Sequence, residues 1–200
     1  MIPGRKSPRA LWPAVALLLG SCAVNPATGE RMFSLVSESQ EIEMGRESHP
    51  SIVGSMGEYP SDEVQDYLDD LGVRMAAISE RPDLPWEFTV LDDPLINAFA
   101  LPGGFIYMTR GIMVYMRSEA EFVGVLGHEI GHVTARHSVE QISRQQLLQV
   151  GAGVGMILSP QVRANSQLLG QALQLATLKF GRDDEMQSDD LGLRYMTALG

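Results

Sequence analysis

The sequence predicts an α+β domain that is mainly helical and carries one small β-sheet. Two capping patterns, Ser-x-x-Gln at Ser37 and Ser-x-x-Glu at Ser118, predict helix starts, and apolar residues at helical spacing follow the second. Between these two patterns, residues 86–109 contain three short apolar stretches separated by proline and glycine, which is typical of strands. The chain has 200 residues, of which 44% are hydrophobic, and this is enough to bury one core.

Four helices are expected around the strands. The first covers residues 37–48, because Pro50 is expected to stop it. The second covers residues 61–80, where apolar residues form a helical stripe and acidic residues form the solvated face. A short helix over residues 111–116 leads into the long helix that Ser118 begins. A further apolar run with helical character is expected before residue 181.

Three strands are expected at residues 86–90, 97–101 and 105–109. The first alternates between polar and apolar residues, as a half-buried strand does. The other two are joined by a tight turn at Pro102-Gly103-Gly104, and proline favours an edge strand over a central one. An open strand edge can bind an extended polypeptide through main-chain hydrogen bonds, although a purely structural hairpin is an equally good interpretation.

The sequence His128-Glu129-Ile130-Gly131-His132 lies in the helix that follows Ser118. Residues four apart share a helix face, so His128 and His132 can direct both imidazoles at one Zn²⁺ ion. Glu129 lies about 100° round the helix from His128. Its carboxylate can therefore act as a general base on a water molecule beside the metal. The motif predicts a zinc-dependent peptidase; the alternative is a surface helix with two histidines by chance.

A catalytic zinc site needs a third protein ligand. His137 lies about 180° round a continuous helix from His128, so it is interpreted as a structural or capping residue. His49 has no visible partner. Glu185 and Asp189 are four residues apart, so Glu185 can bind the metal while Asp189 accepts a hydrogen bond from a ligand histidine. From the residues alone, an acidic helix start that suits the helix dipole explains this segment better.

Three motifs in order resemble a family of zinc metallopeptidases. They are NAFALPGGFIYMTRG at 97–111, HEIGHVTARH at 128–137 and ExxxD at 185–189. The family contains the CAAX prenyl proteases, bacterial HtpX and the periplasmic β-barrel-assembly-enhancing protease, and the resemblance runs from about Asn25 to residue 200.

The resemblance implies a zincin-like domain of the gluzincin type, whose small sheet borders the active-site cleft. It implies one Zn²⁺ per chain, bound by His128, His132 and Glu185. It also implies that Glu129 is the base and that Asp189 orients a ligand histidine. The residues expected to bind the substrate are Asn97, Ala98, Phe99 and Ala100.

The first 21 residues resemble an export signal. Basic residues precede the apolar run 10–19, which is too short to span a membrane. Leu19-Gly20-Ser21-Cys22 resembles a bacterial lipobox, which predicts lipidation of Cys22, the one cysteine of the chain. The alternative is an ordinary secretory signal with a chance cysteine. Residues 22–36 are then expected to form a tether and residues 37–200 the metallopeptidase domain, truncated at its C-terminus.

These features predict a periplasmic protein anchored to a membrane through the lipid on Cys22, and they favour the outer membrane over the inner one. The formal net charge of −10 argues against nucleic acid and anionic lipid as charge-driven partners. The expected substrates are misfolded or stalled cell-envelope proteins, with the outer-membrane assembly machinery as a partner. Two alternatives stay open: a non-catalytic zinc-binding chaperone, and a zinc hydrolase of another class such as a cell-wall amidase. Residues 147–166 are expected to form a lid beside the cleft or to touch the membrane.

Overall fold

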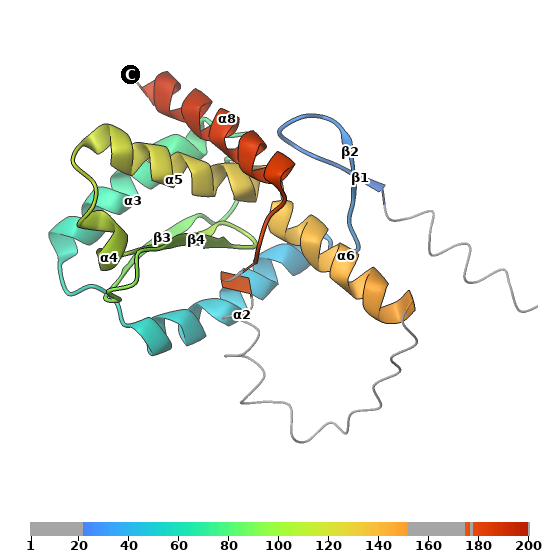
Figure 1. Cartoon of the computed structure of the whole chain (residues 1–200), viewed down its shortest axis with the longest axis horizontal. Helices are drawn as coiled ribbons and strands as arrows, with labels where there is room; N and C mark the ends of the chain where they lie inside the picture. The colour runs from blue at the N-terminus through green and yellow to red at the C-terminus, as the bar shows by residue number, and fades with distance from the viewer. Residues whose placement is uncertain (1–21, 152–174, 177, 200) are drawn as a thin grey trace, which may run out of the picture.

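The computed structural model describes residues 22–151, 175–176 and 178–199, and its fold is α+β and mainly helical, as predicted. Figure 1 shows a small sheet covered by helices on both faces. The elements, in chain order, are β1 (Cys22–Val24), β2 (Arg31–Phe33), α2 (Glu38–Met56), α3 (Asp62–Ala77), β3 (Glu87–Leu91), β4 (Ala98–Leu101), β5 (Phe105–Thr109), α4 (Arg110–Met113), α5 (Glu119–Thr134), α6 (His137–Gly151) and α8 (Arg182–Leu199).

The central sheet has the strand order β3-β5-β4, so the three predicted strands are confirmed. β5 pairs with β3 in parallel and with β4 in antiparallel orientation. The prediction that the first strand is half-buried was wrong, because every residue of β3 from Phe88 to Leu91 is buried. Helices cover both faces of the sheet. The face that the alternating polar residues predicted to be exposed to water is therefore buried as well.

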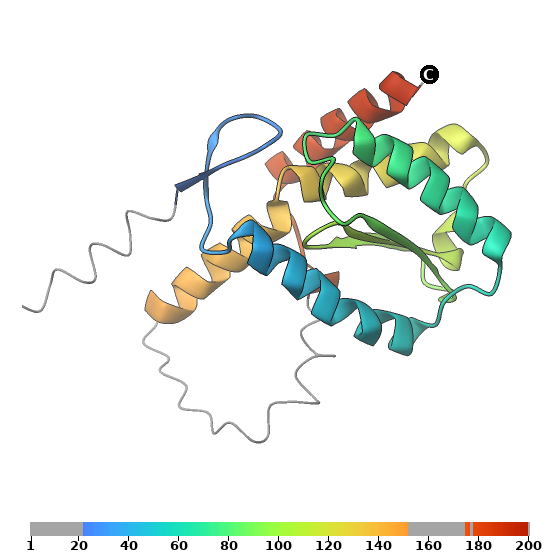
Figure 2. The same cartoon turned by 180° about the vertical axis from the view of Figure 1, so that it is seen from behind.

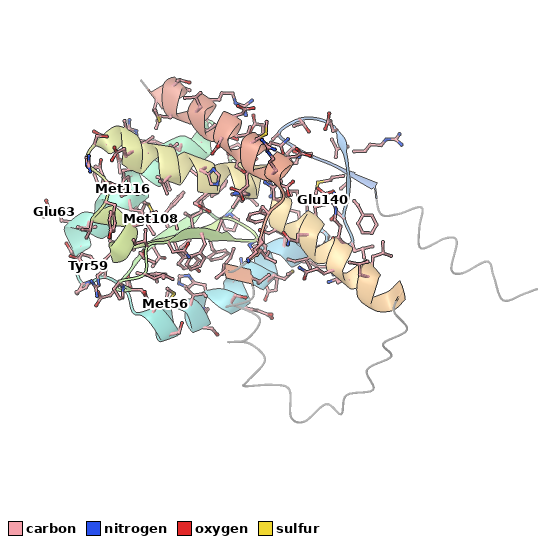
Figure 3. The ribbon with its side chains drawn as sticks, in the orientation of Figure 1. Met56, Tyr59, Glu63, Met108, Met116 and Glu140 are labelled. Carbon is pink, nitrogen blue, oxygen red and sulfur yellow. The ribbon has the colours of Figure 1, made fainter. Side chains whose placement is uncertain are left out.

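Two apolar layers hold the sheet between the helices. α2 lies on one face of the sheet, and α3 and α5 lie on the other, as the two opposite views in Figures 1 and 2 show. On the α3 and α5 side, Leu68, Leu126 and Ile130 are fully buried against Met108 of β5, which is labelled in Figure 3. On the α2 side, Ile52 is fully buried in a second cluster with residues of all three strands.

Helix α2 begins at the predicted cap, where Ser37 and Gln40 form a complete capping box. The expectation that Pro50 stops this helix was wrong, since α2 continues to Met56. Pro50 is on the exposed side, and burial of Ile52 two residues later stabilises the continued helix.

His49 does have partners, contrary to the sequence interpretation. Its Nδ1 lies 2.8 Å from the hydroxyl of Tyr107 in β5, and its Nε2 lies 3.1 Å from a carboxylate oxygen of Glu87 in β3. These partners are about 40 and 60 positions away in the chain, so only the packing of α2 on the sheet brings them to His49.

Strands β1 and β2 form an antiparallel hairpin, in which Cys22 pairs with Phe33. Hydrogen bonds connect this N-terminal segment to α6 and α8. Asn25 donates a hydrogen bond to Gln187 of α8, and the backbone N–H of Leu35 donates one to Ser143 of α6. The segment interpreted as a tether thus forms a hairpin that contacts α6 and α8 (Figure 1).

Two sequence predictions fall largely outside the described residues. Of the lid segment 147–166, residues from 152 onward are not described, and the preceding residues continue α6. Of the apolar run before residue 181, residues 175–176 are described and helical, and residues 178–180 are described and not helical. None of the helices within the described ranges is long and apolar enough to cross a membrane.

Candidate metal centre

Helix α5 carries the HExxH residues in its last two turns. Ser118 caps the helix by accepting a hydrogen bond from the N–H of Glu121, as predicted. The Glu121 carboxylate accepts from the N–H of Arg117, so the reciprocal half of the capping box is displaced by one residue. Because His128 and His132 are one turn apart on this helix, their Nε2 atoms lie 3.0 Å from each other.

Helix α8 adds a carboxylate to this pair. Glu185 lies in its first turn, with one oxygen 3.5 Å from Nε2 of His128 and the other 3.8 Å from Nε2 of His132. One donor atom from each of the three residues lies within 4.8 Å of the others. The 53 positions between His132 and Glu185 are bridged because α8 packs along α5 (Figure 1).

The donor set fits a zinc ion in kind and in spacing. Two neutral imidazole nitrogens and one carboxylate oxygen are among the ligands that Zn²⁺ prefers. Tetrahedral ligands at about 2.0–2.2 Å from a metal lie about 3.3–3.6 Å from one another. The two Nε2 atoms are 3.0 Å apart, and the two oxygens of Glu185 lie 3.5 Å from His128 and 3.8 Å from His132, all close to that range. Small side-chain rotations are therefore enough to hold an ion between them.

Asp189, one turn after Glu185, contacts the outer nitrogen of His128. The Nδ1–H of His128 donates a hydrogen bond of 2.8 Å to the Asp189 carboxylate. A carboxylate accepts only, so the proton of His128 is on Nδ1 and the lone pair of Nε2 faces the other donors. This contact is the one expected from the ExxxD spacing.

His132 is buried and is enclosed by two rings. Its Nδ1 lies 2.9 Å from Nδ1 of His137, and the ring of Phe180 stacks on it at 4.1 Å between centroids. Burial lowers the pKa of His132 far below the usual value, and the neighbouring His128 and His137 lower it further. His132 is therefore neutral, which is the form that binds metals.

His137 reaches His132 because the helix does not continue through Arg136. Arg136 has φ of 62°, in the left-handed region, and this turn ends α5 and starts α6. The angle counted for a continuous helix does not apply across such a break. His137 lies outside the group of three donors, and burial lowers its pKa as well.

Glu129 follows His128 on α5 and is buried, with 9% of the residue exposed. Burial raises its pKa to about 8, and the negative charge of Glu185 contributes to the rise. A dication between the ligands would act in the opposite direction and favour the carboxylate. Glu129 is thus a buried carboxyl group whose proton affinity is set by its neighbours, which suits a residue that takes up and releases a proton.

Glycine residues allow α8 to approach α5 closely. A Cβ atom on Gly192 would lie 2.9 Å from backbone atoms of Gly127 and His128, and one on Gly131 would lie 3.0 Å from the carbonyl oxygen of Ser188. Any larger residue at these positions would push the two helices apart. The glycines therefore set the distance between the histidines on one helix and Glu185 on the other.

A buried ion cluster supports the turn between α5 and α6, and sequence reasoning missed it. The carboxylate of Glu41 in α2 is 1% exposed and accepts from Arg81 at 2.7 Å and from Arg136 at 2.8 Å. Arg81 also donates to the carbonyl oxygen of Val133, and Arg136 to that of Val36. Glu41 is in the first turn of a helix, where an acidic residue is ordinary, so its local sequence gives no signal of this role.

The predicted substrate strand lies at the edge of the sheet next to α5. Within the described ranges, no other strand pairs with the outer side of β4. Thr109 donates its backbone N–H to the carbonyl oxygen of Asn97, so these two residues form a hydrogen-bonded pair. Hydrogen-bonded and free pairs alternate in an antiparallel ladder, so Phe99 also bonds to β5, while Ala98 and Ala100 direct their backbone N–H and C=O groups outward.

A mainly helical α+β domain that carries HExxH on one helix and a distant Glu on another has the architecture of a metallopeptidase domain. Comparison with known proteins is more specific. Residues 62–200 match the model of peptidase family M48, and the chain belongs to that family.

Curated relatives agree with the family. The chain is 30% identical over 176 residues to mitochondrial metalloendopeptidase OMA1 of Schizosaccharomyces pombe, covering 86% of this chain and 51% of the relative. It is 30% identical over 146 residues to the putative beta-barrel assembly-enhancing protease of Vibrio cholerae, covering 68% and 30%. It is 27% identical over 183 residues to the beta-barrel assembly-enhancing protease of Escherichia coli, covering 88% and 38%. The chain thus spans between 30% and 51% of the length of these relatives.

Proposed function

We propose that this chain is a zinc endopeptidase whose metal is bound by His128, His132 and Glu185. The observation that carries the proposal is the convergence of these three donors within 4.8 Å from two helices. Membership in peptidase family M48 supports it independently of the geometry. Asp189 orients His128, and Glu129 is the residue that moves the proton.

Bound zinc supplies a Lewis acid that lowers the pKa of water and polarises the scissile carbonyl group. Glu129 accepts a proton from the water that attacks the carbonyl carbon, and it delivers this proton to the leaving amine nitrogen. Its position on α5, one residue after a metal ligand, keeps its carboxylate beside the reacting atoms and outside the donor set.

The edge of β4 is the proposed binding site for the substrate backbone. The outward N–H and C=O groups of Ala98 and Ala100 can pair with an extended polypeptide. Asn97 and Phe99 use their backbone groups on the β5 side, so they contribute to substrate binding only through their side chains. A strand bound at this edge would run beside α5, which packs against β4 and carries Glu129.

The proposal is tested with Glu129→Gln, which keeps the size of the side chain and removes the base. We expect zinc content equal to wild type and loss of at least a hundredfold in the cleavage of unfolded casein. A variant that cleaves casein at a near wild-type rate would rule Glu129 out as the base. Glu185→Ala is the matching test of the third ligand, since it is expected to lose bound zinc on metal analysis.

The natural setting is the finer part of the proposal. The lipobox-like sequence before Cys22 and the names of the bacterial relatives support a periplasmic lipoprotein, more favourably in the outer membrane, that degrades misfolded or stalled envelope proteins near the outer-membrane assembly machinery. Metabolic labelling with a radioactive fatty acid tests the anchor. We expect label in the wild-type protein and none in Cys22→Ala, and an unlabelled wild-type protein would contradict lipidation.

A further inference from the structure

The mechanism leaves one buried histidine without a role. His137 is 3% exposed and lies against the outer nitrogen of His132. An imidazole that binds a metal through Nε2 must carry its proton on Nδ1, and the group that accepts from Nδ1 decides whether it does. Asp189 fulfils this need for His128. For His132 the group at Nδ1 is another imidazole, which can either donate or accept.

A chain of hydrogen bonds decides whether Nδ1 of His137 donates to His132 or accepts from it. It begins in the N-terminal hairpin, where the backbone N–H of Ala27 donates to Oδ1 of Asn25 at 2.9 Å. A backbone N–H can only donate, so the other end of the Asn25 amide is the NH₂ group. This group donates to Oε1 of Gln187 at 3.2 Å, and the same oxygen lies 2.8 Å from Nε2 of His137.

Each following assignment is then forced. An amide oxygen only accepts, so Nε2 of His137 carries a proton and donates to Gln187. In a neutral imidazole the other nitrogen is then an acceptor, so Nδ1 of His137 accepts from Nδ1–H of His132. The hydroxyl of Ser188 lies 3.3 Å from the same Nδ1 and can donate to it as well, which agrees with an acceptor there.

We propose that His137 is a positioning residue that holds His132 in its Nδ1–H tautomer, through a hydrogen-bond chain that starts at Asn25 in the N-terminal hairpin. The lone pair of Nε2 of His132 thereby faces the other two proposed metal ligands, His128 and Glu185. The part of this inference that concerns the metal rests on the zinc site proposed above. Through these hydrogen bonds the N-terminal hairpin also supports the metal centre, although it lies more than 100 residues before His132 in the sequence.

The test uses Gln187, which lies between the hairpin and His137 and is only half-buried. Gln187→Leu removes the acceptor at 2.8 Å from Nε2 of His137 and leaves the Asp184 carboxylate at 3.9 Å, beyond hydrogen-bond distance, so His137 can turn its proton towards His132. Gln187→Glu is the rescue variant, because a carboxylate oxygen still accepts from His137. Gln141→Leu is the matched control. It makes the same chemical change at a residue of α6 that lies one turn after His137 and does not belong to the series of hydrogen bonds.

The first measurement is the ¹⁵N spectrum of the imidazoles in the zinc-free protein. We expect His132 as the Nδ1–H tautomer in wild type, Gln187→Glu and Gln141→Leu. In Gln187→Leu we expect a shift towards the Nε2–H form. A wild-type His132 protonated on Nε2 would overturn the inference, as would a Gln187→Leu spectrum equal to that of wild type.

The second measurement is zinc affinity, by competition with a chelating dye. We expect the Kd of Gln187→Leu to rise about tenfold, the lower end of the loss that is usual when the partner of a ligand histidine is removed, because Gln187 acts through His137. The Kd values of the other two variants should stay near wild type. An unchanged Kd in Gln187→Leu would refute the positioning role. A wild-type protein that binds no zinc would instead overturn the proposed function, while the metal-free spectrum would still judge the hydrogen-bond chain by itself.

Discussion

Replacing Gly192 with alanine tests whether the contact between α5 and α8 sets the metal site. The new Cβ would lie 2.9 Å from backbone atoms of Gly127 and His128, whereas ordinary contacts begin at 3.4 Å. Neither backbone can rotate away as a side chain could, so the helices must separate by about half an ångström. Because His128 is itself one of the proposed ligands, the displacement falls directly on the donor set.

The size of the effect follows from two opposing contributions. Forcing extra volume into a packed contact costs about 1–3 kcal/mol. Alanine in a helix interior is about 1 kcal/mol more favourable than glycine, which offsets part of this cost. The net loss in the free energy of unfolding is therefore about 0–2 kcal/mol for Gly192→Ala.

Gly124→Ala is the matched control on α5. A Cβ at Gly124 meets only the sulfur of Met196, at 4.0 Å, so the helix gains the alanine without a clash. The helix preference cancels between the two variants, and their stabilities should differ by the packing cost alone, about 1–3 kcal/mol.

Urea unfolding measures the stabilities, and a chelator competition measures zinc binding. We expect the zinc Kd to rise about tenfold in Gly192→Ala, as when support of a ligand is lost, and to stay unchanged in Gly124→Ala. Equal stability and equal zinc affinity in the two variants would refute the idea that the glycine contact positions Glu185 against the histidines.

Three further predictions concern stability. Glu41→Gln should lower the free energy of unfolding by about 3–5 kcal/mol, because it removes the buried charge that pairs with both Arg81 and Arg136 and leaves Arg81 with only the exposed carboxylate of Glu38; a loss below 1 kcal/mol in urea unfolding would contradict this. Pro50→Ala should raise the same quantity by about 2 kcal/mol, since proline in a helix interior costs about 3 kcal/mol and its stiffness in the unfolded chain returns part of that; a variant no more stable than wild type would count against it. Removal of zinc should lower the melting temperature, because an ion at 100 times its Kd stabilises a fold by about 2.7 kcal/mol; a melting curve unaffected by chelator in wild type would argue against an intrinsic zinc site.

Local sequence predicted the elements well wherever the signal was itself local. The caps at Ser37 and Ser118 depend on a serine hydroxyl and an N–H three residues later, and both are present. The turn between β4 and β5 depends on glycines that adopt positive φ, and Gly103 and Gly104 have φ of 86° and 103°. These interactions lie within one turn of the chain, so no tertiary contact was needed to foresee them.

The predictions that failed depended on partners far away in the chain. Pro50 lies within a helix because Ile52 is buried against the sheet, which helix propensity does not register. β3 is buried on both faces because helices that precede it and a helix that follows it in the sequence cover the sheet. His49 found Tyr107 and Glu87 only once α2 lay on the strands.

The metal centre likewise has features that follow from local sequence and features that depend on tertiary contacts. The sequence by itself determined that His128 and His132 share a face and that Glu129 does not, because a helical turn fixes those directions over five residues. Only the tertiary structure decided that Glu185 lies opposite them and that His137 folds back onto His132. The physical reason is that these contacts depend on the glycine-lined approach of α8 to α5 and on the left-handed turn at Arg136, which is held by a carboxylate from α2.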